Sequence, residues 1–308
     1  MADLELITDQ LQFPEGPIAT SDGKVIVVEI RNGRLSEVDV ASGSITTLAE
    51  CGGGPNGAAV GPDSQIWVCN NGGFMWHEIE GMVAPGPQPE DYIGGRIQRV
   101  DRNRGTVTDV YDRCGEHHLK GPNDIVFDRE GGFWFTDLGK TRARDSDHGG
   151  LYYAAADGSR IDEVVYPLTQ PNGVGLSPAA DRVYVTETGP GRVWQWDIEA
   201  PGHVAAKDRG PGGATLLWGF DGYQLLDSLA VDSEGNVCVA TLVTGAISVI
   251  SPSGQLVEQV AVPEYDVFVT NICFGGEDLR TAYITSSGLG RLYATTWPCP
   301  GLPLAHVL

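Results

Sequence analysis

The chain has 308 residues, of which 41% are hydrophobic, 42 are glycine and 19 are proline, and its formal net charge at pH 7 is −21. This length and apolar content exclude a disordered chain, and the many turn-forming residues favour short strands over long helices. So acidic a chain is expected to bind neither nucleic acid nor an anionic membrane, and divalent cations suit it better.

Neither a membrane span nor a secretory signal is expected. The longest apolar runs, such as residues 25–28, are only the length of a strand, and the first residues lack the basic and apolar regions of a signal peptide. The six cysteines are scattered, without a CxxC pair, and three of them fall in strand-like runs. This usage favours reduced, mostly buried thiols over a disulfide framework and predicts a cytoplasmic protein.

One pattern of strands recurs along the chain. A polar residue followed by a small one opens a short apolar strand, and then come a turn, a β-branched and aromatic strand, and a glycine-led third strand. In chain order, the first strands are expected to begin at Glu15, Asn56, Asn123, Asn172, Asp227 and Asn271. Second strands are expected at 25–30, 66–71, 133–138, 183–188, 237–242 and 282–287, and third strands at 33–39, 95–101, 149–155, 191–197, 245–251 and 290–296. Weaker fourth strands are expected at 45–49, 107–111, 161–166, 214–218 and 256–262.

Six copies of such a unit predict an all-β fold, a six-bladed β-propeller that forms a single closed domain over residues 1–308. A β-sandwich is the alternative, but it gives no reason for one opening motif to recur six times. The sixth unit lacks a fourth strand, and residues 4–11 form a strand without a unit, so this N-terminal strand is expected to complete the last blade. Two insertions, residues 74–94 and 139–148, are expected to be loops over one face.

Every first strand begins with a carboxylate or a carboxamide. The innermost strands of a propeller all run in one direction, so these six side chains should form a ring at one mouth of the central channel. Asn and Asp are common where a loop enters a strand, but this does not explain six cases in a row, one of which is a glutamate. Oxygen ligands with two carboxylates suit a hard divalent cation, Ca²⁺ before Mg²⁺ or Mn²⁺, and Glu15 and Asp227 would balance its charge.

A divalent metal with open coordination positions can polarise a carbonyl oxygen or lower the pKa of bound water, and an aspartate beside it can take a proton. The ring therefore indicates hydrolysis of an activated carbonyl without identifying that carbonyl. The adjacent residues His117 and His118 point apart in an extended segment, and they are expected to line a pocket or the surface rather than bind metal.

Five motifs extend through most of the chain in a specific order. They are residues 13–17 (FPEGP), 121–124 (GPND), 135–137 (FTD), 170–174 (QPNGV) and 270–276 (TNICFGG). With these motifs the chain resembles the SMP-30/gluconolactonase/luciferin-regenerating-enzyme family. The resemblance implies a six-bladed propeller with one divalent metal, often Ca²⁺ or Zn²⁺, at the end of its channel, and lactonase activity. It implies that Glu15, Asn172 and Asp227 hold the metal, that Asn123 is a further ligand or near-ligand, and that Asp227 is the general base.

Two departures from the family pattern bear on the substrate. Sugar-lactone members carry an arginine two residues before the asparagine of the third unit, where this chain has Gly121, and the blade-five motif reads Leu226-Asp227-Ser228 instead of Pro-Asp-Gly. The missing arginine and the apolar residues 74–76 leave open a more apolar lactone or an ester. Candidate substrate-binding residues, each near a loop that should face the metal, are Asn123, Trp76, His77, His118, Lys120, His148 and Tyr223.

The sequence thus predicts a metal-dependent lactonase whose partner is a small lactone or ester, with Asp227 activating water. Two alternatives stay open. One is an arylesterase, another ester hydrolase or non-hydrolytic carbonyl chemistry at the same site. The other is a non-catalytic calcium-binding propeller that binds a metabolite or a protein. The oligomeric state does not follow from the sequence.

Overall fold

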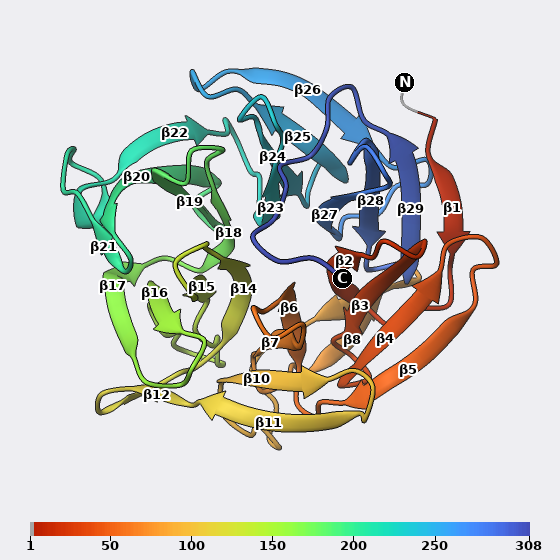
Figure 1. The fold of residues 1–308 in the computed structure, drawn as a ribbon, viewed down its shortest axis with the longest axis horizontal. Helices are drawn as coiled ribbons and strands as arrows, with labels where there is room; N and C mark the ends of the chain where they lie inside the picture. Colours follow the sequence, from red (N-terminus) through yellow and green to blue (C-terminus); the bar gives the residue numbers. More distant parts are fainter. Residues whose placement is uncertain (1–2) are drawn as a thin grey trace.

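In the computed structural model, which describes residues 3–308, six antiparallel sheets stand around one axis (Figure 1). The local cause is the same in each sheet, since β-branched and aromatic residues form the buried strands and glycines with positive φ occupy many of the turns. The expected all-β, six-bladed propeller is therefore confirmed.

Each sheet is one blade, and its strands follow one another from the axis outward. The first strands, in blades 1 to 6, are β2 (Pro14–Ala19), β6 (Pro55–Val60), β14 (Pro122–Phe127), β18 (Pro171–Leu176), β23 (Leu226–Val231) and β27 (Val269–Gly275). The second strands are β3 (Lys24–Glu29), β7 (Ile66–Asn70), β15 (Gly132–Asp137), β19 (Arg182–Glu187), β24 (Val237–Thr241) and β28 (Thr281–Ser286). The third strands are β4 (Arg34–Asp39), β10 (Arg96–Asp101), β16 (Gly149–Ala155), β20 (Arg192–Ala200), β25 (Ala246–Ile250) and β29 (Arg291–Thr296). The outer strands are β5 (Ile45–Glu50), β11 (Thr106–Tyr111), β17 (Ile161–Leu168), β22 (Thr215–Gly219), β26 (Leu256–Ala261) and, in blade 6, β1 (Glu5–Thr8).

Blade 6 is completed by the other end of the chain, as expected. Strand β1 runs antiparallel to β29, with Glu5 opposite Ala294 and Leu6 opposite Tyr293. In Figure 1 the red β1 lies beside the blue β29 at the outer edge of the ring. The sheet of blade 6 therefore joins the two ends of the chain and closes the propeller.

The insertion at residues 74–94, expected as a loop, contains a hairpin of β8 (Trp76–Ile79) and β9 (Met82–Pro85). Its two-residue turn explains the difference, because Glu80 and Gly81 both have positive φ (53° and 84°), the backbone that tight hairpins need. The remaining short elements are β12 (Arg113–Cys114), β13 (His117–His118), β21 (His203–Val204) and the 3₁₀ turn η1 (Pro211–Gly213). Within residues 3–308, no helix has the length and apolar character needed to cross a membrane.

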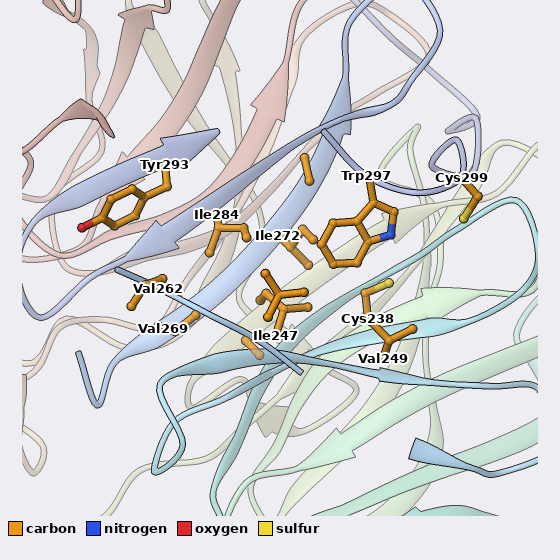
Figure 2. Close-up of a cluster of buried hydrophobic side chains, with 13 residues drawn as sticks. Cys238, Ile247, Val249, Val262, Val269, Ile272, Ile284, Tyr293, Trp297 and Cys299 are labelled. Atoms are coloured by element: carbon orange, nitrogen blue, oxygen red, sulfur yellow. The ribbon is translucent and has the colours of Figure 1, made fainter. Parts of the chain in front are cut away.

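Six apolar clusters hold the blades together, and each cluster lies between two neighbouring blades. Figure 2 shows the one between blades 5 and 6, where Cys238 and Ile247 of blade 5 meet Ile272 and Ile284 of blade 6. Buried tryptophans lie at two of these interfaces: Trp67 between blades 2 and 3, and Trp134, Trp194 and Trp196 between blades 3 and 4. The core is thus a ring of interfaces around the channel.

The C-terminal segment crosses one mouth of the channel, and the C-terminus lies near the middle of Figure 1. The Leu302 N–H donates to the Val231 carbonyl (3.0 Å), the Ser21 N–H donates to the Leu308 carbonyl (3.0 Å), and His306 packs edge-on against Phe127. These contacts are with the far ends of first strands in blades 1, 3 and 5. A cavity of about 530 Å³ lies between this segment and the first strands.

Candidate functional site

The six polar residues that begin the first strands are brought to the other mouth of the channel, opposite the C-terminal segment. Glu15, Asn56, Asn123, Asn172 and Asn271 are only 2–5% exposed, and Asp227 is half-buried. At this point each first strand carries one extra residue relative to its second strand, a β-bulge in all six blades. Bulges twist a strand and re-aim its side chains, so the repeated bulge turns the polar side chains toward the mouth.

Glycines directly after the ring residues let neighbouring first strands come close together. A Cβ on Gly57 would lie 2.4 Å from the Asn123 carbonyl oxygen, and one on Gly16 would lie 2.6 Å from the Ala58 nitrogen. A side chain at either position would therefore force the strands apart. The glycine after the ring residue in blades 1, 2 and 4 thus has a steric cause.

Two buried threonines tie the ring residues of blades 3, 4 and 5 into one backbone network. Thr136 accepts from the Asp124 N–H (3.2 Å) and donates to the Asn172 carbonyl. Thr186 accepts from the Gly173 N–H (2.7 Å) and donates to the Asp227 carbonyl (2.7 Å). Each hydroxyl therefore links the bulge of its own blade to the ring residue of the next.

Three carboxylates share this buried mouth, and burial raises the pKa of each. Burial raises the pKa of Glu15 to about 7, while hydrogen bonds from Asn271 Nδ2 (2.7 Å) and the Gly16 N–H (2.6 Å) oppose the rise. Burial, and then the Glu15 charge, raise the pKa of Asp124 to about 8. The same two causes hold the pKa of Asp227 well above its ordinary value. Such a concentration of buried negative charge suits a bound cation.

Whether the ring residues fit the implied metal can be judged from the hydrogen bonding of their oxygens. Glu15 Oε1, Asn123 Oδ1 and Asn172 Oδ1 are buried and have no hydrogen-bond partner among residues 3–308. An unpaired buried acceptor is costly, and a hard cation satisfies such oxygens, so the expected ligand set fits a divalent metal. No three His, Cys, Asp or Glu side chains within the described part of the chain form a group able to hold a metal. The expected set is of a different kind, with two carboxylates and two carboxamides.

Asp124 is the member of this site that sequence reasoning missed. Strict alternation along a strand would turn it away from Asn123, but the bulge between Pro122 and Ile125 removes that alternation. Its carboxylate accepts from the N–H groups of Ile125 (2.9 Å) and of Val174 (3.2 Å) in the next blade. The signal was present in the sequence, because Asp124 stands where blades 1, 2 and 4 have a glycine.

The candidate substrate-binding residues other than Asn123 lie on the loops and short strands that connect the blade strands at the ring's mouth. Trp76 is half-buried, with its ring 5.2 Å from that of Phe13 and 6.1 Å from that of Phe74. The others are exposed to solvent and no described contact gathers them into one pocket with the ring; they are His77, His118, Lys120, His148 and Tyr223. Their role in substrate binding stays a prediction.

The two insertions meet over this face, which confirms that they lie on one side of the propeller. Lys140 donates to the Gly73 carbonyl (2.7 Å) and to Asn71 Oδ1 (3.1 Å), and its ammonium stands 3.9 Å from the centre of the Phe74 ring. Burial lowers the pKa of Lys140 to about 7. At the far end of the hairpin the Val83 N–H donates to the Gly288 carbonyl in blade 6 (2.8 Å). The segment 71–83 is thus bonded to blade 3 through Lys140 and to blade 6 through Val83.

Comparison with known proteins gives consistent findings. A family model described as the SMP-30/gluconolactonase/LRE-like region matches residues 13–288. Lactonase drp35 of Staphylococcus saprophyticus is 28% identical over 265 residues, which cover 85% of this chain and 74% of that protein. A solved gluconolactonase structure from Xanthomonas campestris superposes with a TM-score of 0.75 at 22% identity, covering 96% of this chain and 90% of that one. Regucalcin from Agrobacterium tumefaciens, a calcium-binding protein, superposes with a TM-score of 0.75 at 16% identity, covering 99% and 98%.

Proposed function

The chain belongs to the SMP-30/gluconolactonase/LRE-like family, and from this premise we propose that it is a divalent-metal-dependent hydrolase of a lactone. The observation that carries the proposal is the set of buried oxygens of Glu15, Asn123 and Asn172, which have no hydrogen-bond partner in the described part of the chain, beside the carboxylate of Asp227. Relatives named lactonase and gluconolactonase support the reaction class. Ca²⁺ is proposed ahead of Zn²⁺, Mn²⁺ or Mg²⁺, because the donors are all oxygens and one structural relative is a calcium-binding protein.

In the proposed mechanism, Glu15, Asn123, Asn172 and Asp227 hold the metal. The metal, when bound, supplies a Lewis acid for the lactone carbonyl. Asp227 is the half-buried member of the set, so its carboxylate is placed to take a proton from an attacking water. The water oxygen bonds to the carbonyl carbon, the ring C–O bond breaks, and the ring oxygen takes up the proton to give a hydroxy acid. Asn271 and the Gly16 N–H keep Glu15 in place during these steps.

The proposed substrate is an apolar lactone rather than a sugar lactone. A Cβ on Gly121 would lie 2.5 Å from the Gly139 carbonyl oxygen, so the arginine that sugar-lactone members carry there has no room. Phe13, Phe74 and Trp76 form an aromatic cluster under the hairpin at the same mouth. We expect the apolar part of the substrate to lie against this cluster, with Asn123, His77, His118, Lys120, His148 and Tyr223 as the polar candidates around it.

Hydrolysis by metal-stripped protein tests the proposal directly. A pH-stat assay would follow sugar, aliphatic and aryl lactones, with aryl esters in parallel, after Ca²⁺, Mn²⁺ or Zn²⁺ is added back. We expect metal-restored turnover that favours apolar lactones and that is lost in folded Asp227→Asn. Turnover of aryl esters without turnover of lactones would show that the protein is an arylesterase instead. Absence of turnover on every substrate, with Ca²⁺ still bound, would overturn the catalytic proposal in favour of a binding propeller.

A further inference from the structure

In the three blades that supply Glu15, Asn123 and Asn172, the second strand ends in a buried acid. Strand β3 ends at Glu29, β15 at Asp137 and β19 at Glu187, and none of these side chains is more than 4% exposed. The other second strands end in uncharged residues, which are Asn70, Thr241 and Ser286. A buried carboxylate is expensive unless it is well bonded, so its place in these three blades needs a physical explanation.

Each of these acids accepts the backbone N–H found three residues before the proposed metal ligand of its own blade. Gln12 N–H donates to Glu29 Oε2 (2.9 Å), and this bond fixes the segment that leads into Glu15. Lys120 N–H donates to Asp137 Oδ2 (2.7 Å), and this bond fixes the segment that leads into Asn123.

The arrangement repeats in blade 4, where Thr169 N–H donates to Glu187 Oε1 (2.6 Å) ahead of Asn172. The carboxylates themselves are held by other donors. Glu29 accepts from Arg34 Nε (2.7 Å), and Glu187 accepts from Trp194 Nε1 (2.7 Å). The tether therefore joins the loop to a fixed point of the sheet.

We propose that Glu29, Asp137 and Glu187 are positioning residues that set the direction of the metal ligands Glu15, Asn123 and Asn172. This inference rests on the proposed metal site. Hydrogen bonds to an ionised acceptor are about twice as strong as neutral ones, and groups that orient metal ligands typically change metal affinity 10–100-fold when they are lost. A tether three residues from the ligand leaves the loop little freedom to rotate the ligand oxygen away.

In the remaining blades, the loop before the ring residue is bonded to a different kind of acceptor. This difference distinguishes the proposed role from ordinary turn capping. In blade 5 the acceptor is Gln224, which lies in the loop itself and accepts from Leu225 N–H (3.1 Å). In blade 6 it is Asp266, also in the loop, which accepts from Phe268 N–H (2.8 Å). Blade 2 has the strand-end arrangement, but with the neutral Asn70 accepting from Gly54 N–H (3.0 Å). Within residues 3–308, a charged anchor on the neighbouring strand thus occurs only with the proposed ligands of blades 1, 3 and 4.

Asp137 gives the sharpest test, because its hydrogen bonds among the described residues all come from backbone N–H groups: Lys120, Gly121 (2.7 Å) and Gly139 (2.9 Å). Asp128 is its matched control. It is a buried aspartate at the opposite end of the same blade, and it accepts from the N–H groups of Glu130 (2.8 Å) and Gly132 (3.1 Å).

Calcium affinity of the metal-stripped full chain would be measured by titration calorimetry at 25 °C, with circular dichroism to show that each variant is folded. Asp137→Leu is expected to bind Ca²⁺ at least about tenfold more weakly. Asp137→Asn keeps an oxygen for the Gly121 and Gly139 N–H groups but loses the charge and places an NH2 group opposite Lys120 N–H, so its affinity should lie between those of the wild type and Asp137→Leu. Asp128→Leu should lower the melting temperature but leave the affinity unchanged.

Unchanged affinity in folded Asp137→Leu, or an equal loss in Asp128→Leu, would overturn the positioning role. Glu187→Met, with the same tenfold expectation, takes the place of Asp137→Leu if that variant does not fold. Wild-type protein that binds Ca²⁺ without hydrolysing any lactone would overturn the proposed reaction but leave this inference standing. Wild-type protein that binds no divalent metal would overturn both.

Discussion

Lys140 is a buried lysine whose charged form is disfavoured by burial. It is 2% exposed, between the rings of Phe74 and Tyr92, and its lowered pKa of about 7 compares with an ordinary value near 10.5. The unfolded chain therefore binds more protons than the folded chain between these two values. It follows that the cost of burying this lysine is complete below pH 7 and disappears as the pH rises toward 10.5.

Replacing Lys140 by methionine should remove this pH dependence. Tyr92, whose ring lies beside the Lys140 ammonium, does not change charge between pH 7 and 9, because burial raises its pKa to about 12. We expect the free energy of unfolding of the wild type, relative to Lys140→Met, to increase from pH 7 to 9 by up to about 1.4 kcal/mol per pH unit. Urea unfolding at both pH values measures this difference, and a difference that does not change with pH would contradict the lowered pKa.

Thr186 makes a second prediction at the residue scale. Its fully buried hydroxyl accepts from the Gly173 N–H and donates to the Asp227 carbonyl. Thr186→Val keeps the shape of the side chain but leaves that N–H without a partner, which should lower the free energy of unfolding by about 1–3 kcal/mol. Urea unfolding of the metal-stripped protein measures the loss. Equal stability of variant and wild type would show that the hydroxyl does not tie the two blades together.

The ring residues could be identified from the sequence because the repeat itself aligns them. Glu15, Asn56, Asp227 and their three counterparts occupy equivalent positions in the six units, and equivalent positions in a propeller must lie at one level of the channel. Asp124 could not be assigned in the same way, because its direction depends on a bulge, and the pairing of backbone groups that defines a bulge leaves little trace in a single sequence.

At the scale of elements, strand order was predictable and one insertion was not. Continuous runs of apolar, largely β-branched residues mark strands such as β3 and β24, so their expected and observed bounds agree to within a residue or so. The β8–β9 hairpin depends on the backbone of Glu80 and Gly81 instead. Its strands are mostly exposed or half-buried, so they lack the apolar periodicity that reveals the blades.

Strand β1 gives the prediction that belongs to this scale. Removal of residues 1–9 would leave the β29 edge in blade 6 without its partner and would uncover apolar residues such as Leu292. Exposed edges pair with other molecules, so we expect a lower melting temperature and concentration-dependent aggregation. Scanning calorimetry and light scattering at several concentrations would measure both. A deletion variant that melts reversibly at the wild-type temperature would show that blade 6 does not need its outer strand.

For the whole molecule, metal binding and stability should be linked. Glu15, Asp124 and Asp227 put three carboxylates from three blades into one buried mouth, so an ion bound there joins the blades as well as balancing charge. A ligand that binds only the folded state at a hundred times its Kd adds about 2.7 kcal/mol of stability. Ca²⁺ should therefore raise the melting temperature and a chelator should lower it, as calorimetry would show. Glu15→Gln should lose most of this gain; an undiminished gain would place the ion elsewhere.

The pairing of β1 with β29 also decides when the molecule can be completed. These strands are separated by almost the whole chain, so their contact carries a large loop-closure cost and cannot form during synthesis until blade 6 has left the ribosome. Five blades can already be assembled by then, with both ends of the ring open. We expect the closing step to be the slow phase of refolding, and its reversal to be the first event of unfolding. The lifetime of the native state would then depend on one short strand, however well the other blades are packed.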